Sequence, residues 1–124
     1  MSMPWNVEFH DDFVAEYYEW PESVQIELRA HVQALEFLGP QMKRPRVDTL
    51  HGSKHENMKE LRFDAAGGAW RFAFAFDPSR QAIVLCGGDE SGGSERRLYQ
   101  QLVAKADARF DSHCARLKTE EQGL

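Results

Sequence analysis

The 124-residue chain, with 42% hydrophobic and 28% charged residues, has the length and composition of one globular domain. No stretch approaches the ~18 apolar residues of a membrane-spanning helix, and the first residues lack the pattern of a signal peptide, so a cytoplasmic location is expected. The two cysteines lack the spacing of a metal site or a disulfide framework and are expected to be reduced thiols.

The net charge of −5 hides a segregation of charge along the chain. Residues 1–40 carry eight acidic side chains against a single arginine, whereas residues 42–80 carry eight basic against five acidic side chains and residues 94–118 carry six against three. Such asymmetry is typical of a protein that binds a polyanion on one side. A surface held by internal ion pairs would give the same pattern, so charge alone leaves both interpretations open.

The first third of the chain predicts a strand and two helices. Residues 5–10 alternate apolar and polar side chains as a half-buried strand does. Helix-start signals and apolar residues at three- and four-residue spacing then predict an antiparallel helix pair over 11–19 and 21–38, which Gly39-Pro40 ends. Residues 40–57 contain prolines, a glycine and many cations and are expected to be a mostly irregular connection.

Residues 58–88 predict a three-stranded meander, because two alternating runs meet at Ala-Ala-Gly-Gly and a third follows an Asp-Pro-Ser-Arg turn. A period of two sorts the side chains of the first two strands onto two faces. The expected core face holds Leu61, Phe63, Trp70, Phe72, Phe74 and Phe76. The opposite face holds Glu60, Arg62, Arg71, Ala73 and Ala75. Its small alanines are expected to leave a groove.

Residues 94–117 predict a last helix, with Ser94 as its N-cap and an apolar stripe from Leu98 to Phe110. Residues 1–118 are expected to form a single domain and 119–124 a flexible tail. The order of elements predicts an α+β fold. In it, the helices pack on one side of a small antiparallel sheet made of the N-terminal strand and the meander.

Two glycine-rich motifs and one histidine pair do not support their usual chemistry. Gly87-Gly88-Asp89-Glu90 matches the signature loop of cyclic-dinucleotide synthases, but here it joins a strand to a helix instead of lying on a hairpin of a longer domain. A P-loop is also unsupported, because no lysine follows the glycines. His51 and His55 are four residues apart, but Gly52 disfavours a helix there, so no metal site and no cofactor are predicted.

Three segments, residues 47–63, 70–78 and 83–110, resemble the RelE/HigB toxins of bacterial and phage toxin–antitoxin modules. The match is to the phage-type branch, which has Gly-Ser-Lys before the first meander strand, and it covers about residues 5–117. The resemblance implies a RelE-like fold and cleavage of messenger RNA in the ribosomal A site. It also implies silencing by a small antitoxin, often a helix-turn-helix protein encoded alongside.

The resemblance implies site residues, and metal-independent RNA cleavage fits them, since it needs a base, an acid and cations for the extra phosphorane charge. Arg71 matches the family arginine, whose planar fork can hold two phosphate oxygens. Tyr99 matches the family tyrosine, which can stack on a base or, if cations lower its pKa, accept a proton. Lys54 and His55 are further candidates for proton transfer. Further candidate phosphate contacts are Lys59, Arg62, Arg96 and Arg97.

The chain departs from the family pattern at Met58 and Glu60, where some RelE-type nucleases have lysines, and at Asp89, where they have a cation. Two other functions stay open. One is a ParE-like toxin, which shares the fold and poisons DNA gyrase, and the other is a remnant that binds an antitoxin without cutting RNA. In each case we expect an antitoxin to cover the face of Arg62 and Arg71 or the last helix.

Overall fold

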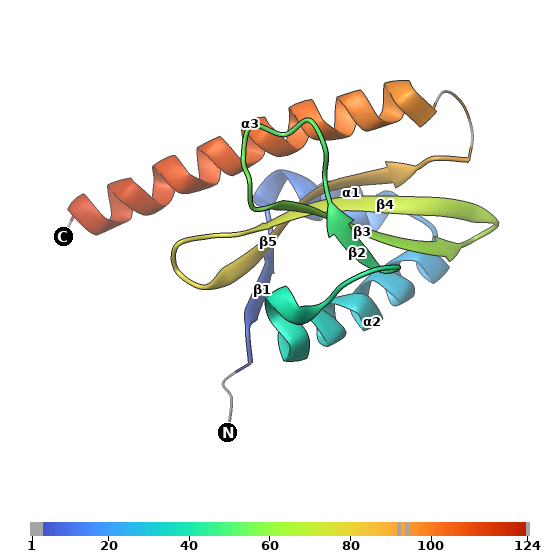
Figure 1. Cartoon of the computed structure of the whole chain (residues 1–124), viewed down its shortest axis with the longest axis horizontal. Coiled ribbons are helices and arrows are strands. Elements are labelled where there is room, and N and C mark those ends of the chain that lie inside the picture. Colours follow the sequence, from blue (N-terminus) through green and yellow to red (C-terminus); the bar gives the residue numbers. More distant parts are fainter. Residues whose placement is uncertain (1–3, 92, 94, 124) are drawn as a thin grey trace.

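The structure is a computed structural model that describes residues 4–91, 93 and 95–123 (Figure 1). In chain order its elements are β1 (Asn6–Phe9), α1 (Asp11–Glu19), α2 (Glu22–Leu38), the 3₁₀ turn η1 (Gly39–Gln41), β2 (Val47–Thr49), β3 (Met58–Ala65), β4 (Gly68–Phe76), β5 (Gln81–Asp89) and α3 (Glu95–Gln122). The predicted α+β class is confirmed. α3 continues through most of the segment expected to be a flexible tail, and the predicted N-cap Ser94 lies outside the described residues. Within the described ranges, no helix is both long and apolar enough to cross a membrane.

The sheet differs from the prediction in two ways. Its strand order is β1-β5-β4-β3-β2, and β1 runs parallel to β5, so the sheet is mixed and not purely antiparallel. After β1, the two helices cross one face of the sheet, and the chain re-enters the sheet at the opposite edge as β2. β1 therefore lies at the first edge, beside the last strand, β5. β2 lies within residues 40–57, expected to be mostly irregular, because three residues are too few to show alternation and pairing with β3 defines them.

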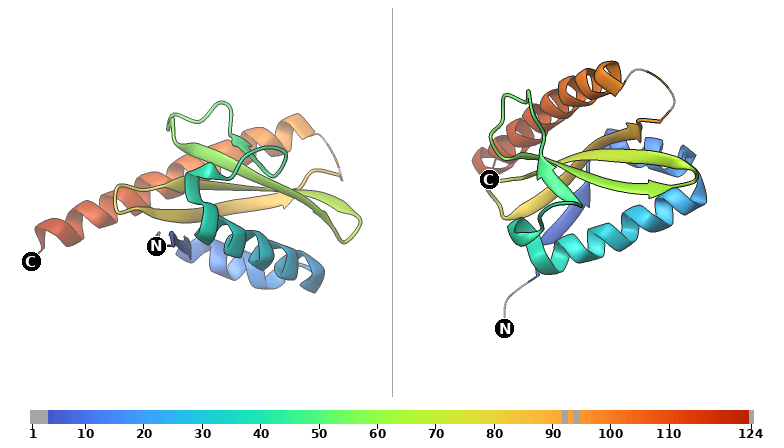
Figure 2. Two further views of the ribbon diagram at one scale, coloured as in Figure 1. Left: turned by 60° about the horizontal axis from the view of Figure 1, so that its bottom comes forward. Right: turned by 45° about the vertical axis from the view of Figure 1, so that its right-hand side comes forward.

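Helices cover both faces of the sheet, with α1 and α2 on one side and α3 across the other (Figure 1, Figure 2). The prediction that all helices pack on one side was therefore wrong. Ala73 and Ala75 explain the difference, because their small, fully buried side chains let α3 pack directly onto β4 where a groove is predicted. α3 contributes Leu102, Ala106 and Phe110 of the predicted apolar stripe to this contact.

The aromatic face of the meander packs against α1 and α2, as predicted. Phe72 and Phe74 are at most 1% exposed, and Phe72 makes ring contacts with Phe13 of α1 and Phe63 of β3. Each fully buried phenylalanine stabilises the fold by roughly 1.5–3 kcal/mol through removal of apolar surface from water. This core holds the sheet rigidly beneath the residues on its other face.

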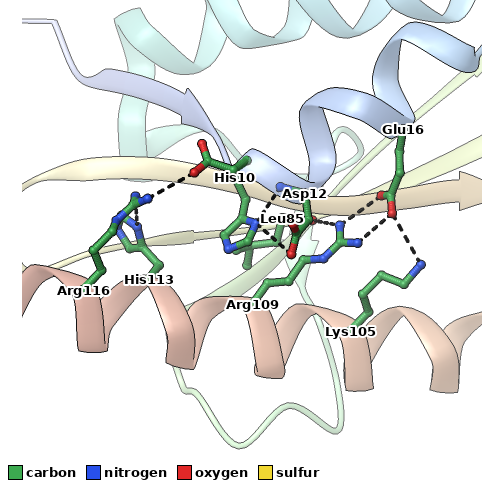
Figure 3. Close-up of polar contacts among 9 residues, drawn as sticks. His10, Asp12, Glu16, Leu85, Lys105, Arg109, His113 and Arg116 are labelled. Carbon is green, nitrogen blue, oxygen red and sulfur yellow. Dashed lines mark hydrogen bonds and ion pairs between the residues drawn. The ribbon is translucent and has the colours of Figure 1, made fainter.

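Ion pairs hold α3 against α1 (Figure 3). Arg109 Nη1 and Nη2 donate to the two carboxylate oxygens of Glu16 at 2.9 and 2.6 Å, and Nη1 also donates to the Leu85 carbonyl oxygen at 2.7 Å. Arg116 contacts Asp11 at 3.3 Å. Part of the charge segregation along the sequence is therefore neutralised inside the molecule, and internal ion pairs account for this part of the pattern.

Candidate functional site

A hollow of about 600 Å³ lies where the first turns of α3 pass over β3 and β4. Residues from β2, the loop after it, β3, β4 and α3 line this hollow: Asp48, His51, Glu60, Arg62, Arg71, Glu95, Arg96, Tyr99 and Gln100. We call it the Arg71 cleft. Its lining is charged or polar apart from the Tyr99 ring, whereas the neighbouring part of this sheet face is apolar.

Strand pairing decides which predicted residues reach the cleft. Arg62 of β3 pairs with Arg71 of β4, and both line the cleft because they point to the same face of the sheet. Gly88 of β5 lies beside Arg71 in the register and places no side chain there. Lys59 is three residues from Arg62 and so lies on the opposite face, where it lines a separate hollow with Phe76.

Arg71 has three carboxylates around it. Its Nε lies 2.7 Å from Glu90 Oε1 and 3.3 Å from Glu60 Oε2, and its Nη2 lies 4.0 Å from Glu95 Oε1. The guanidinium also lies over the Tyr99 ring, 4.8 Å from the ring centre. Among the described residues, neither Arg71 Nε nor Glu60 Oε2 has a well-aligned hydrogen-bond partner, although both atoms are buried. Buried polar atoms left in this state are rare and are typical of functional sites.

Burial raises the pKa of Glu60 and of Glu90, and the charge of Arg71 opposes the shift in both. Glu60 is only 4% exposed, so its carboxylate has little water to stabilise it. A buried carboxylate whose pKa is raised is a stronger base than an ordinary carboxylate. Glu60 is therefore a candidate proton acceptor. Sequence reasoning placed Glu60 on the face of Arg71 but assigned it no role, treating it as a departure from the family pattern.

Tyr99 is protonated, and its phenol oxygen accepts a hydrogen bond from the backbone of a neighbouring loop. Burial raises the pKa of its phenol, and this outweighs the lowering effects of Arg71 and of a hydrogen bond from the His51 backbone. The condition under which Tyr99 would accept a proton, a pKa lowered by nearby cations, is therefore not met. The His51 N–H donates to Tyr99 Oη at 2.6 Å, so the tyrosine also holds the β2–β3 loop at the edge of the cleft.

Lys54 and His55 lie away from Arg71, although they belong to the same loop as His51. The ammonium of Lys54 contacts the Asp111 carboxylate, and His55 Nε2 lies 2.8 Å from Asp111 Oδ1. Asp111 follows Tyr99 by roughly 18 Å along the axis of α3, at about 1.5 Å per residue. The structure therefore places these two predicted catalytic residues beside the middle of the helix, and neither lines the cleft.

Two of the predicted phosphate contacts, Arg62 and Arg96, line the cleft, whereas Arg97 is exposed on the first turn of α3 outside its lining. His51 and Glu90 are site residues that sequence reasoning missed. The alternation of β3 and β4 was the one available signal, and it placed Glu60 on the face of Arg71. No spacing in the sequence shows that the loop carrying His51 returns along α3.

Comparison with known proteins identifies the family. The profile of the family described as "Phage derived protein Gp49-like (DUF891)" matches residues 15–111. The chain is 42% identical over 90 residues to the putative toxin HigB2 of Mycobacterium tuberculosis, a match that covers 72% of this chain and 44% of the relative. It is 45% identical over 84 residues to the putative toxin HigB3 of the same organism, covering 68% of this chain and 71% of the relative. The chain thus spans less than half the length of the first of these relatives.

Solved structures show the same fold. A free-state structure of the Escherichia coli toxin RelE, in which two arginines are replaced by alanine, aligns with a TM-score of 0.57 at 11% identity over 80% of this chain and 97% of that one. The archaeal RelE–RelB complex from Pyrococcus horikoshii gives a TM-score of 0.53 at 17% identity over 73% of this chain and 100% of the aligned chain. The predicted RelE-like fold is confirmed, and the chain belongs to the phage-derived Gp49-like family.

Proposed function

We propose that this protein is the toxin of a toxin–antitoxin module and a metal-independent endonuclease that cleaves messenger RNA on the ribosome. One observation carries the proposal: a single cleft holds Arg71, suited to a phosphate, beside Glu60, a buried carboxyl group suited to accept a proton. Relatives named as putative HigB toxins and a fold shared with RelE support the assignment. An mRNA target also implies a cytoplasmic location.

In the proposed reaction the scissile phosphodiester replaces Glu90 and Glu95 beside Arg71, while Glu60 stays in place. The planar guanidinium of Arg71 then holds two phosphate oxygens, and Arg62 adds a second positive charge as negative charge grows in the transition state. Glu60 takes the proton from the ribose 2′-hydroxyl, and the 2′-oxygen forms a bond to phosphorus. The bond from phosphorus to the 5′-oxygen breaks, leaving a 2′,3′-cyclic phosphate and a 5′-hydroxyl.

The leaving 5′-oxygen needs a proton, and two side chains of the cleft can supply it. His51 lines the cleft, and imidazole is the side chain that most often transfers protons near neutral pH. Tyr99 accepts the His51 backbone hydrogen bond, which leaves its own O–H proton free to be donated. We propose His51 as the acid and Tyr99 as a donor to the phosphate or a stacking surface for a base.

The charge of the cleft supports a requirement for the ribosome. Four carboxylates line or contact it, Asp48, Glu60, Glu90 and Glu95, against the three arginines Arg62, Arg71 and Arg96. Free RNA should therefore bind weakly, because affinity for nucleic acid depends on neutralised phosphates. A ribosome that presents mRNA at high local concentration offsets this weakness. The proposed partner that silences the activity is a small antitoxin, as RelB accompanies RelE in the archaeal complex.

The test is induction of the chain in bacterial cells, followed by mapping of new 5′ ends in cellular RNA within minutes. We expect cuts within translated frames and rapid arrest of growth. Arg71→Ala should abolish both. Arg29→Ala replaces an exposed arginine on the far side of the sheet and should retain both.

Circular dichroism of purified Arg71→Ala protein establishes that the variant is folded. Cuts that persist in this folded variant would refute the role of Arg71. Arrest with intact mRNA and an induced DNA-damage response would instead indicate a gyrase poison. Absence of arrest in the unsubstituted chain would indicate a remnant without activity. Purified chain that has been treated with EDTA and then freed of the chelator should still cleave mRNA on ribosomes kept in their normal magnesium buffer, which tests independence from a metal ion bound to the chain.

A further inference from the structure

The outer surface of α2 has a regular apolar stripe that no described part of the chain covers. The inner surface of α2 packs against the sheet through Val24, Leu28, His31 and Leu35. The residues two positions after each of these lie about 200° further around the helix, on its solvent side, and repeat the same spacing of four, three and four residues. The residues of this outer stripe are Ile26, Ala30, Gln33 and Phe37. Such spacing is typical of a seam between two helices.

Phe37 is the main apolar feature of this stripe. Its side chain is 83% exposed, and Ile26 on the same stripe is 50% exposed. Phe37 lines two hollows of about 910 and 600 Å³, and Pro4 lines both of them. An exposed aromatic side chain beside hollows that can receive other side chains is typical of the centre of a protein–protein interface.

The charge on α2 restricts what can bind there. Glu22, Glu27 and Glu36 are its acidic residues, and Arg29 is its only arginine or lysine. These positions flank the apolar stripe as the charged positions of a coiled coil flank its seam, and there they select a partner by charge. The amide of Gln33 offers a hydrogen bond within the stripe, which can fix the register of a second helix.

We propose that the outer face of α2 docks an amphipathic helix of a partner protein, one whose apolar stripe is flanked by lysine or arginine. A second copy of this chain is a poorer fit. Each copy would bring three glutamates and one arginine to the seam, so the flanking charges would be mostly alike, and a parallel pairing would set Glu22 of one copy beside Glu27 of the other. An anionic membrane surface would be repelled by the same glutamates.

The docking face lies on the opposite side of the sheet from the Arg71 cleft, since α2 covers one face and α3 the other (Figure 2). A helix bound to α2 therefore leaves the cleft open. It follows that this partner and an RNA oligonucleotide can occupy the protein together. The inference goes beyond the proposed nuclease function and does not depend on it.

The experiment measures binding of two fluorescein-labelled peptides to the full chain by fluorescence anisotropy. Both are three-heptad helices with leucine at the seam positions; one has lysine and the other glutamate at the flanking positions. We expect the lysine peptide to bind, with an affinity that falls as salt is raised, and the glutamate peptide not to bind. Phe37→Ala should weaken binding of the lysine peptide about tenfold or more.

A charge reversal and a matched control complete the test. The double variant Glu27→Lys, Glu36→Lys should exchange the preference for the two peptides. Val14→Ala removes an exposed apolar side chain of α1 and should leave binding unchanged. Thermal unfolding shows that each variant is folded. Failure of the lysine peptide to bind, equal binding of both peptides, or self-association of the chain that Phe37→Ala abolishes would each overturn the proposal.

Discussion

Arg71 and Arg109 are both largely buried arginines that contact carboxylates, yet their surroundings differ. Arg109 forms two direct hydrogen bonds to the single carboxylate of Glu16 and one to a backbone carbonyl. Arg71 contacts three carboxylates, and its Nε lacks an aligned hydrogen bond. A structural ion pair is balanced and satisfied, whereas the Arg71 cleft holds more carboxyl groups than arginines and has unsatisfied atoms that a ligand can use.

The carboxylates differ in the same way. A hydrogen bond from Arg109 lowers the pKa of Glu16, whereas burial raises the pKa of Glu60. The fold therefore favours the ionised form of Glu16 and the protonated form of Glu60. Contact between opposite charges is therefore not by itself a sign of a structural role. The two arginines are distinguished by whether each of their buried polar atoms has an aligned hydrogen-bond partner.

The largest expected effect is that of Glu60→Gln. If Glu60 is the base, the substitution should lower the rate of RNA cleavage on ribosomes by about 10³-fold. The activity of the unsubstituted chain should rise with pH through the raised pKa of Glu60, because the base must be ionised, whereas that of Glu60→Gln should stay low and flat. A Glu60→Gln variant with the normal pH profile would refute the assignment.

The same variant should not lose stability at neutral pH. The pKa of Glu60 is higher in the folded chain than in the unfolded one, so its stabilising proton is fully bound at low pH and lost as pH rises through the folded pKa. Glutamine resembles the neutral acid and avoids this loss. Urea unfolding should therefore show Glu60→Gln at least as stable as the unsubstituted chain at neutral pH, with the difference vanishing in acid.

Arg71→Lys and Arg109→Lys test the two arginines directly. Lysine keeps the charge but cannot hold two phosphate oxygens in a planar fork, so Arg71→Lys should lower cleavage by about 10²-fold without destabilising the protein. Arg109→Lys should leave cleavage within about twofold and lower the melting temperature, because it loses a bidentate pair. If both variants lost activity equally, the distinction between the two arginines would fail.

Glu16→Gln should give the opposite dependence of stability on pH from Glu60→Gln. The pKa of Glu16 is lowered in the folded chain, so its contribution to stability is present above the unfolded pKa and is lost as pH falls through the folded pKa. We expect Glu16→Gln to cost about 1–2 kcal/mol of unfolding free energy at neutral pH, since Glu16 is partly exposed, and almost nothing in strong acid. Urea titrations at several pH values measure this.

The comparison also shows how far the sequence predicts this molecule. Alternation in β3 and β4 is a local property, so it correctly placed Arg62, Arg71 and Glu60 on one face. The partners of these side chains depend on contacts distant in sequence, such as Glu90 at the end of β5 and His51 in a loop that returns along α3. Burial, which sets the direction of the pKa shifts, is likewise a property of the assembled fold.

Two further differences have the same cause. Lys54 and His55 were grouped with Arg71 because they precede β3 in the sequence, but their contacts with Asp111 hold them at the middle of α3. His113 has no partner that spacing reveals, whereas in the structure its Nε2 lies 2.8 Å from the buried carboxylate of Asp77. Both contacts join the last helix to segments far back in the chain, and periodicity cannot show them.

Glu95→Gln should have the smallest effect and the opposite sign. Glu95 is the outermost carboxylate around Arg71, at 4.0 Å and with 70% of its side chain exposed, so water screens most of its charge. Its removal should raise the affinity of the cleft for a short RNA oligonucleotide by about two- to threefold at low salt, and the gain should disappear as salt is raised. Glu121→Gln, near the other end of α3, is the matched control and should change nothing. Unchanged or weaker RNA binding in Glu95→Gln would show that the excess carboxylates do not limit the site, and the contrast between Arg71 and Arg109 would then rest on geometry alone.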